Sequence, residues 1–130
     1  MNLESRRAVF AEVHKAIDEA AQSVIDCLSS DVNLELTYPP GIEISPQELE
    51  YLAGIDIAPE AKKILKKIIA DACGYPVFHM ISLLDGVTEP YVIEIPEWFG
   101  GTLAGDPDKG IMLHDEFFEA YWDYDNRKSD

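Results

Sequence analysis

The spacing of apolar residues divides the chain into helical stretches and a few short extended ones. From residue 3 to 29, apolar side chains recur at steps of three and four, which predicts a long amphipathic helix. Residues 58–86 predict a second long helix. Gly74-Tyr75-Pro76 lies inside it, and Pro76 lacks a backbone N–H and crowds the preceding turn. We therefore expect a kink there, or a break into two helices.

Three further signals mark helix ends. Ser45-Pro46-Gln47-Glu48 has the form of a capping box, which predicts a short helix that ends at Gly54. Gly54 and Gly86 each suit the left-handed position that often ends a helix. Asp115 or His114 is expected to cap a last helix, which carries its aromatic residues on one face.

Apolar and polar residues alternate in Leu34–Tyr38 and in Tyr91–Ile95, with the period of a half-buried strand. Ile111–Leu113 is a candidate third strand. The pattern predicts an α+β fold, in which three to four helices pack on a small antiparallel sheet. A length of 130 residues fits a single domain over residues 1–130.

Charge adds a strong bias to this picture. The chain has ten Lys and Arg against 25 Asp and Glu, a formal net charge of −15. Between Asp31 and Glu60 there are acids but no base. Such a chain repels nucleic acid and anionic membranes and meets cationic partners faster. We expect a basic protein partner, and neither nucleic acid nor membrane.

Two histidines are candidate catalytic residues. His79 lies in the most apolar part of the second long helix, where it is either a general base or metal ligand, or a core histidine bonded to a carbonyl or to Ser82. His114 precedes Asp115 and Glu116, a set that resembles nitrogen and oxygen metal ligands but also fits an acidic first helical turn. The structural interpretation is favoured for both, so no catalytic residue, metal site or cofactor is assigned.

Large aromatic residues are candidate ligand or interface residues. Trp98 and Phe99 adjoin Gly100-Gly101 and form either a binding edge or a plug at the end of the core. Phe118 and Trp122 of the last helix face either a partner or the core.

The remaining motifs are weak. The loop Gly105–Gly110 resembles a calcium loop but lacks its third acid and its terminal glutamate, so we interpret it as a surface turn. Cys27 and Cys73 form no disulfide framework, which favours a reducing compartment. The sequence has no apolar signal core and no window of 18 apolar residues, and we expect a cytoplasmic protein.

These observations favour a non-enzymatic interaction module that binds a basic partner, as an inhibitor, immunity protein or antitoxin does. The alternative is a small enzyme or ligand-binding protein with a pocket near His79. A third hypothesis is a nucleic-acid mimic, whose carboxylates imitate phosphates. A homodimer is compatible with all three.

Overall fold

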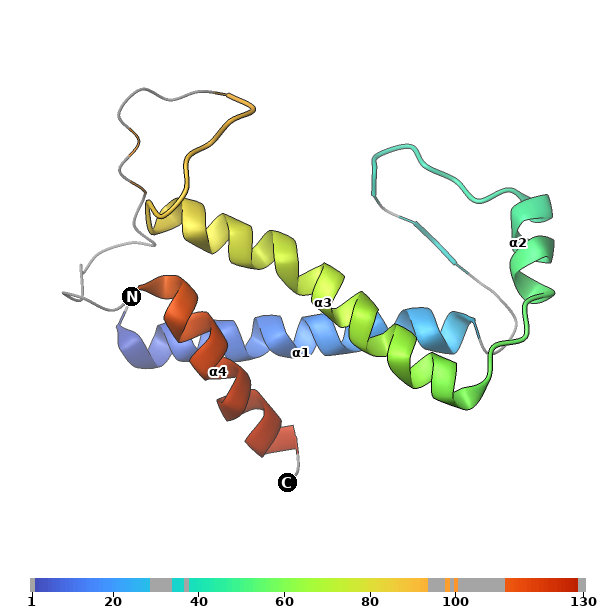
Figure 1. Cartoon of the computed structure of the whole chain (residues 1–130), viewed down its shortest axis with the longest axis horizontal. Coiled ribbons are helices and arrows are strands. Elements are labelled where there is room, and N and C mark those ends of the chain that lie inside the picture. Colours follow the sequence, from blue (N-terminus) through green and yellow to red (C-terminus); the bar gives the residue numbers. More distant parts are fainter. Residues whose placement is uncertain are drawn as a thin grey trace. The chain divides into compact units, whose positions relative to one another are not determined.

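The structure is a computed structural model, which describes residues 2–28, 34–36, 38–93, 98, 100 and 112–128. The described residues form four α-helices and no strand (Figure 1). The helices are α1 (Leu3–Cys27), α2 (Pro46–Ala53), α3 (Pro59–Leu84) and α4 (Leu113–Lys128).

The predicted α+β fold is therefore wrong. Residues 34–36 and 91–93 have no regular structure, and Leu113, expected in a strand, is the first residue of α4. Tyr91, Val92 and Ile93 are 77%, 99% and 75% exposed, so the alternation buries none of these three residues. Alternation is a local pattern, whereas a strand needs a partner for its backbone groups. These segments are short and adjoin prolines, which cannot donate to a ladder.

The helix-end signals are partly confirmed. Ser45 Oγ accepts from the N–H of Glu48 at 3.2 Å, and the Glu48 carboxylate accepts from the N–H of Ser45 at 2.8 Å, which completes the capping box. Gly86 is left-handed, with φ of 71°. Gly54 is not: its φ is −80°, because its N–H continues the helical pattern and donates to Glu50.

Of the two outcomes expected at Pro76, a kink or a break, the break is wrong, since α3 runs through Pro76 as one helix. A proline inside a helix costs about 3 kcal/mol. The residues after Pro76 offset this cost, because Val77, Ile81 and Leu84 pack into the hydrophobic core. The apolar C-terminal part of α3 is not buried on every side, because Met80 is 53% exposed.

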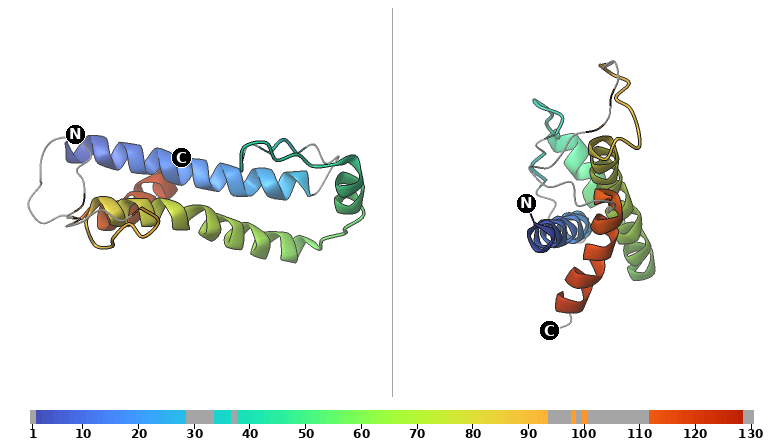
Figure 2. Two further views of the ribbon diagram at one scale, coloured as in Figure 1. Left: turned by 90° about the horizontal axis from the view of Figure 1, so that it is seen from above. Right: turned by 90° about the vertical axis from the view of Figure 1, so that its left-hand side faces the viewer.

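The chain divides into two compact units that share α1 and α3. The first unit contains residues 1–18 and 72–130, and the second unit contains residues 19–71. The first unit thus holds the first half of α1, the second half of α3, and α4. Figures 1 and 2 show α4 beside both of these half-helices.

The core of the first unit lies where these three helices meet. Its buried members come from all three helices: Phe10, Ile81, Leu113, Phe117 and Ala120. The rings of Phe10 and Phe117 meet edge to face, with centroids 5.6 Å apart. This core fixes which side of α4 faces inward.

A buried ion pair joins α1 to α4 beside this core. Arg6 Nη2 donates to Glu116 Oε1 at 3.0 Å, and Arg6 Nε lies 3.0 Å from Glu116 Oε2. The two side chains are only 7% and 5% exposed. Taking both charges out of water is costly, so each depends on the other. The pair therefore fixes the position of α4 along α1.

The second unit buries much less. Among its described apolar residues, only Ala21 and Ile25 are buried, and α2 has no buried residue. Ile64 and Ile68 of α3 are one helical turn apart and each is 58% exposed, so the described residues of the second unit leave this apolar stripe largely uncovered.

We predict that removing one partner of the buried pair strongly destabilises the protein. Arg6→Met or Glu116→Leu alone should lower the free energy of unfolding by about 3–5 kcal/mol, because the remaining buried side chain loses the opposite charge of the pair. The double variant should recover most of this loss, since it buries no charge. Urea unfolding followed by circular dichroism measures all three.

The control is Arg7 with Asp123, an ion pair at 3.3 Å whose side chains are each 42% exposed. Asp123→Leu should change the unfolding free energy by less than about 1 kcal/mol. Equal losses at both pairs, or a double variant as unstable as the sum of the single ones, would contradict the assignment.

Candidate functional site

Asp85, which directly follows α3, forms a close polar contact with His114 in the first turn of α4. Asp85 Oδ2 lies 2.6 Å from Nδ1 of His114 and accepts from the backbone N–H of His114 at 3.0 Å. Asp85 Oδ1 accepts from the N–H of Leu113 at 3.0 Å. The Asp85 side chain is 6% exposed. One buried carboxylate thus satisfies two N–H groups in the first turn of α4.

This geometry corrects the predicted cap of the last helix. Neither His114 nor Asp115 supplies it; the acceptor is Asp85, which follows the last residue of α3. An acid at a helix N-terminus also interacts favourably with the helix dipole. Asp85 lies 28 residues before Leu113 in the sequence, so the residues around Leu113 give no sign of this cap.

The Asp85–His114 pair orients an imidazole, as an acid–base site would require. Its free nitrogen, Nε2, lies 3.6 Å from a carboxylate oxygen of Asp115. Among the described residues, no hydroxyl or thiol hydrogen bonds with His114. The three contacts of Asp85 with the first turn of α4 support a structural role for this pair.

Trp98 and Gly100 lie against the C-terminal end of α3. The indole Nε1 of Trp98 donates to the carbonyl of Leu83 at 3.0 Å, which satisfies a carbonyl in the last turn. Gly100 has φ of 89°, and a Cβ there would lie 2.5 Å from the carbonyl oxygen of Leu84. Only glycine fits this close approach. Trp98 thus covers the helix end, while Phe99 and the loop 105–110 lie outside the described residues.

His79 lies in a different environment from the one predicted. Its side chain is exposed on α3, and its ring stacks parallel to Tyr75 with centroids 6.3 Å apart. It is not a core histidine, and it lines neither of the two grooves described below. The described residues contain no group of three or more His, Cys, Asp or Glu that could hold a metal ion.

The outer side of α4 presents aromatic and acidic residues together. Phe118 is 55% exposed and Trp122 is 59% exposed, and Asp115 and Glu119 are exposed on the same side of the helix. These four residues follow the steps of three and four that define one helical face. We call them the α4 face.

Ring contacts hold the aromatic residues of the α4 face in place. The ring of Phe118 lies 5.3 Å from that of Phe78 in α3 and 5.8 Å from that of Phe117. Trp122 contacts Tyr121 at 5.2 Å. Exposed aromatic side chains with fixed neighbours lose little conformational freedom on binding.

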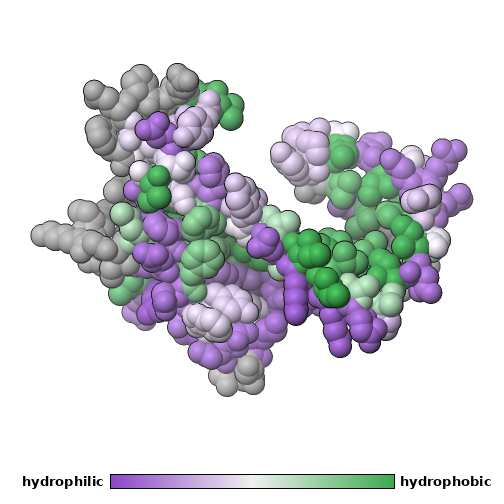
Figure 3. Space-filling view, viewed as in Figure 1, coloured by the Kyte–Doolittle hydropathy of each residue, from purple (hydrophilic) through white to green (hydrophobic). Residues whose placement is uncertain are grey.

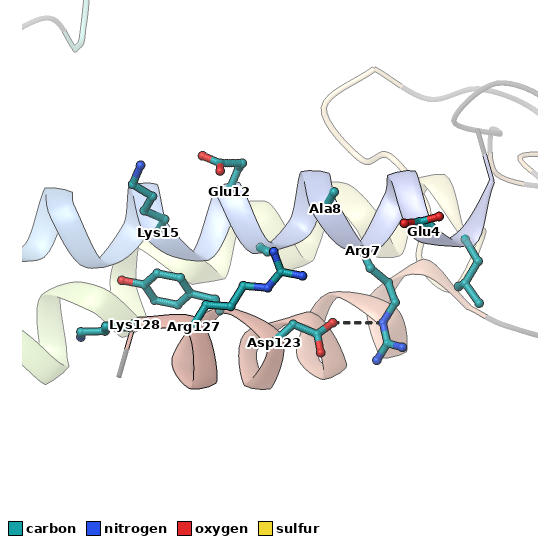
Figure 4. A pocket seen from close by; sticks show the side chains of 11 residues that line it. Glu4, Arg7, Ala8, Glu12, Lys15, Asp123, Arg127 and Lys128 are labelled. Carbon is teal, nitrogen blue, oxygen red and sulfur yellow. Dashed lines mark ion pairs between the residues drawn. The ribbon is translucent and has the colours of Figure 1, made fainter. Parts of the chain in front are cut away.

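A groove of about 750 Å³ lies between α1 and α4 (Figure 4). Ala8 and Ala11 line it, and four cationic residues surround them: Arg7, Lys15, Arg127 and Lys128. Arg7 pairs with Asp123, and Lys128 lies 3.0 Å from Asp18. The hydrogen bond and attraction of Asp18 raise the pKa of Lys128 above its usual value. The acids thus offset the cations, and the groove offers no strong attraction to an anion.

A second groove, of about 770 Å³, lies within the second unit. Its apolar lining comes from α2 and the segment before it, and its charged residues are Glu43 and Glu48. Unlike the groove between α1 and α4, it has no basic residue in its lining.

Sequence reasoning missed His14, which is 8% exposed on α1. Its Nε2 donates to the backbone carbonyl of Phe117 at 2.5 Å, and its ring stacks on that of Phe117 with centroids 4.2 Å apart. Burial lowers the pKa of His14 below its ordinary value, although the bond to Phe117 partly opposes this shift. His14 and Arg6 each lie four residues from Phe10, a spacing that places both near the predicted apolar stripe.

Comparison with models of known protein families, with curated proteins and with solved structures found no match to this chain. Within the described residues, no helix combines the length and apolarity needed to cross a lipid bilayer. Cys27 and Cys73 are both unpaired and half-buried. The exposed surfaces of the protein are therefore the basis for proposing a function.

We predict that His14 makes the protein less stable as the pH falls. The unfolded chain binds a proton on His14 near pH 6.5, whereas the folded protein binds it only at lower pH. The unfolding free energy should therefore decrease as the pH falls from 7.5 through 6.5, and level off below the folded-state pKa. Urea unfolding at a series of pH values measures this slope.

His14→Gln is the matched variant, because its amide can still donate to Phe117 but does not titrate. The difference between the pH slopes of the two proteins gives the contribution of His14, because the carboxylates, His79 and His114 are the same in both. Identical pH slopes for both proteins would refute the assignment.

Proposed function

We propose that this protein is a non-enzymatic interaction module that binds a basic protein partner through the α4 face. The observation that carries the proposal is the exposure of Phe118 and Trp122 on a helical face that also carries Asp115 and Glu119. Aromatic side chains dominate the energy of protein interfaces. A rim of acids adds selectivity for a cationic surface and accelerates the encounter.

The net charge of the whole chain supports a positively charged partner. With 25 acids against ten bases, the net charge of −15 favours approach of a basic surface and disfavours nucleic acid. The two unpaired cysteines support a reducing compartment, and we place the interaction in the cytoplasm.

The packing of α4 supports a preformed binding surface. Its inner side is held by Arg6, His14 and Asp85, while its outer side exposes the two aromatic residues. A rigid helix face that presents aromatic anchors binds at a smaller entropic cost than a disordered segment.

We predict that Phe118→Ala/Trp122→Ala abolishes capture of the partner without unfolding the protein. Tagged wild-type chain, incubated with lysate at low and physiological salt, should retain one stoichiometric partner with a basic surface. Each lost anchor should cost about 2 kcal/mol, or roughly 30-fold in affinity, so the double variant should retain none. Circular dichroism checks that α4 stays folded.

Tyr91→Ala/Val92→Ala is the matched control, since these residues are 77% and 99% exposed and lie outside α4. It removes a similar amount of exposed apolar surface and should leave capture intact. Failure to capture any partner, or equal capture by the α4 variant and the wild type, would overturn the proposal.

A further inference from the structure

The second unit exposes apolar side chains of a size that soluble domains usually bury. Large apolar residues from three of its segments are 40% or more exposed: Leu36, Ile42, Tyr51, Ile55, Ile64 and Ile68. In Figure 3, hydrophobic residues gather over α2 and the start of α3. Contiguous exposed apolar surface of this kind marks an interaction site.

One part of this surface is an apolar stripe beside a basic one on α3. Ile64 and Ile68 are one helical turn apart, and each is 58% exposed. Lys63 and Lys67 precede them by one residue, are exposed, and are also one turn apart. The stripe therefore presents two isoleucines flanked by two lysines.

The other part is the groove of the second unit, which has the opposite charge. Leu36, Ile42 and Tyr51 line it together with Glu43, and its volume of about 770 Å³ leaves room for side chains. Glu48 also lines the groove and is exposed. No base occurs anywhere from Asp31 to Glu60.

We propose that this protein forms a symmetric dimer, in which the α3 stripe of each copy docks into the second-unit groove of the other. A two-fold interface requires a surface that is complementary to itself. The second unit meets this requirement, because it carries both an apolar stripe with lysines and an apolar groove with glutamates. In each of the two equivalent contacts, Ile64 and Ile68 enter the groove while Lys63 and Lys67 face Glu43 and Glu48.

The high net charge makes this pairing selective. Two copies that each carry −15 repel one another in most orientations. The lysine stripe is one of the few places where a second copy meets local positive charge, so docking it on the acidic groove replaces repulsion by attraction. Like-charge contacts disfavour the other arrangements.

The dimer goes beyond the proposed function, because it uses the second unit and needs no other protein. Its test is the molar mass of the purified full-length chain, measured by sedimentation velocity from about 1 to 100 µM. The wild type should dimerise within this range. Ile64→Ser/Ile68→Ser should raise the dissociation constant at least about 100-fold and give a monomer.

Exchange of charges tests which surfaces meet. Lys63→Glu/Lys67→Glu and Glu43→Lys/Glu48→Lys should each be monomeric alone. A one-to-one mixture of the two should form heterodimers, because both contacts then pair opposite charges. The variant that combines all four substitutions keeps the net charge of −15 and should dimerise like the wild type.

Circular dichroism shows that each variant is folded. A monomeric wild type at 100 µM, a dimer that survives Ile64→Ser/Ile68→Ser, or no rescue on mixing would each overturn the dimer. An oligomer larger than two would overturn the closed two-fold arrangement. None of these outcomes bears on the α4 face, whose test is capture of a basic partner.

Discussion

The buried ion pair of Arg6 and Glu116 is the constraint on which the first unit depends. Two opposite charges, both almost fully removed from water, tolerate only the one arrangement in which they meet. That arrangement sets the position of α4 on α1, with Phe10 against Phe117 and His14 under the carbonyl of Phe117. An apolar contact alone would fix this position less strictly, because apolar surfaces slide at small cost.

This constraint connects the interior of the protein to its surface. Glu116 and Phe117 point inward, so Phe118 and Glu119 necessarily lie on the outer side of the same helical turn. Asp85 fixes the start of the helix from α3. The α4 face is thus the exposed side of a helix whose other side is fully engaged, which explains how a small acidic chain can present ordered aromatic residues.

The sequence predicted the local features well and the global ones poorly. Helical periodicity found α1, and the capping box at Ser45 located α2, because both signals depend on neighbours within a few residues. Alternation around Val92 suggested a strand, but whether a strand forms depends on a partner elsewhere in the chain. The roles of Arg6 and Asp85 were missed for the same reason, since each acts across more than 25 residues. The exposure of Phe118 likewise depends on which side of α4 the core occupies.

In the proposed interaction, α4 offers its outer face to a partner while the rest of the first unit stays closed. The chain has two tryptophans, Trp98, bonded to Leu83, and Trp122, exposed on α4. Fluorine NMR of the 5-fluorotryptophan-labelled chain, titrated with the partner recovered by capture, distinguishes them in one spectrum. The Trp122 resonance should shift or broaden on binding, and the Trp98 resonance should not. A shift of Trp98 alone, or an unchanged Trp122 resonance at saturation, would contradict this proposal.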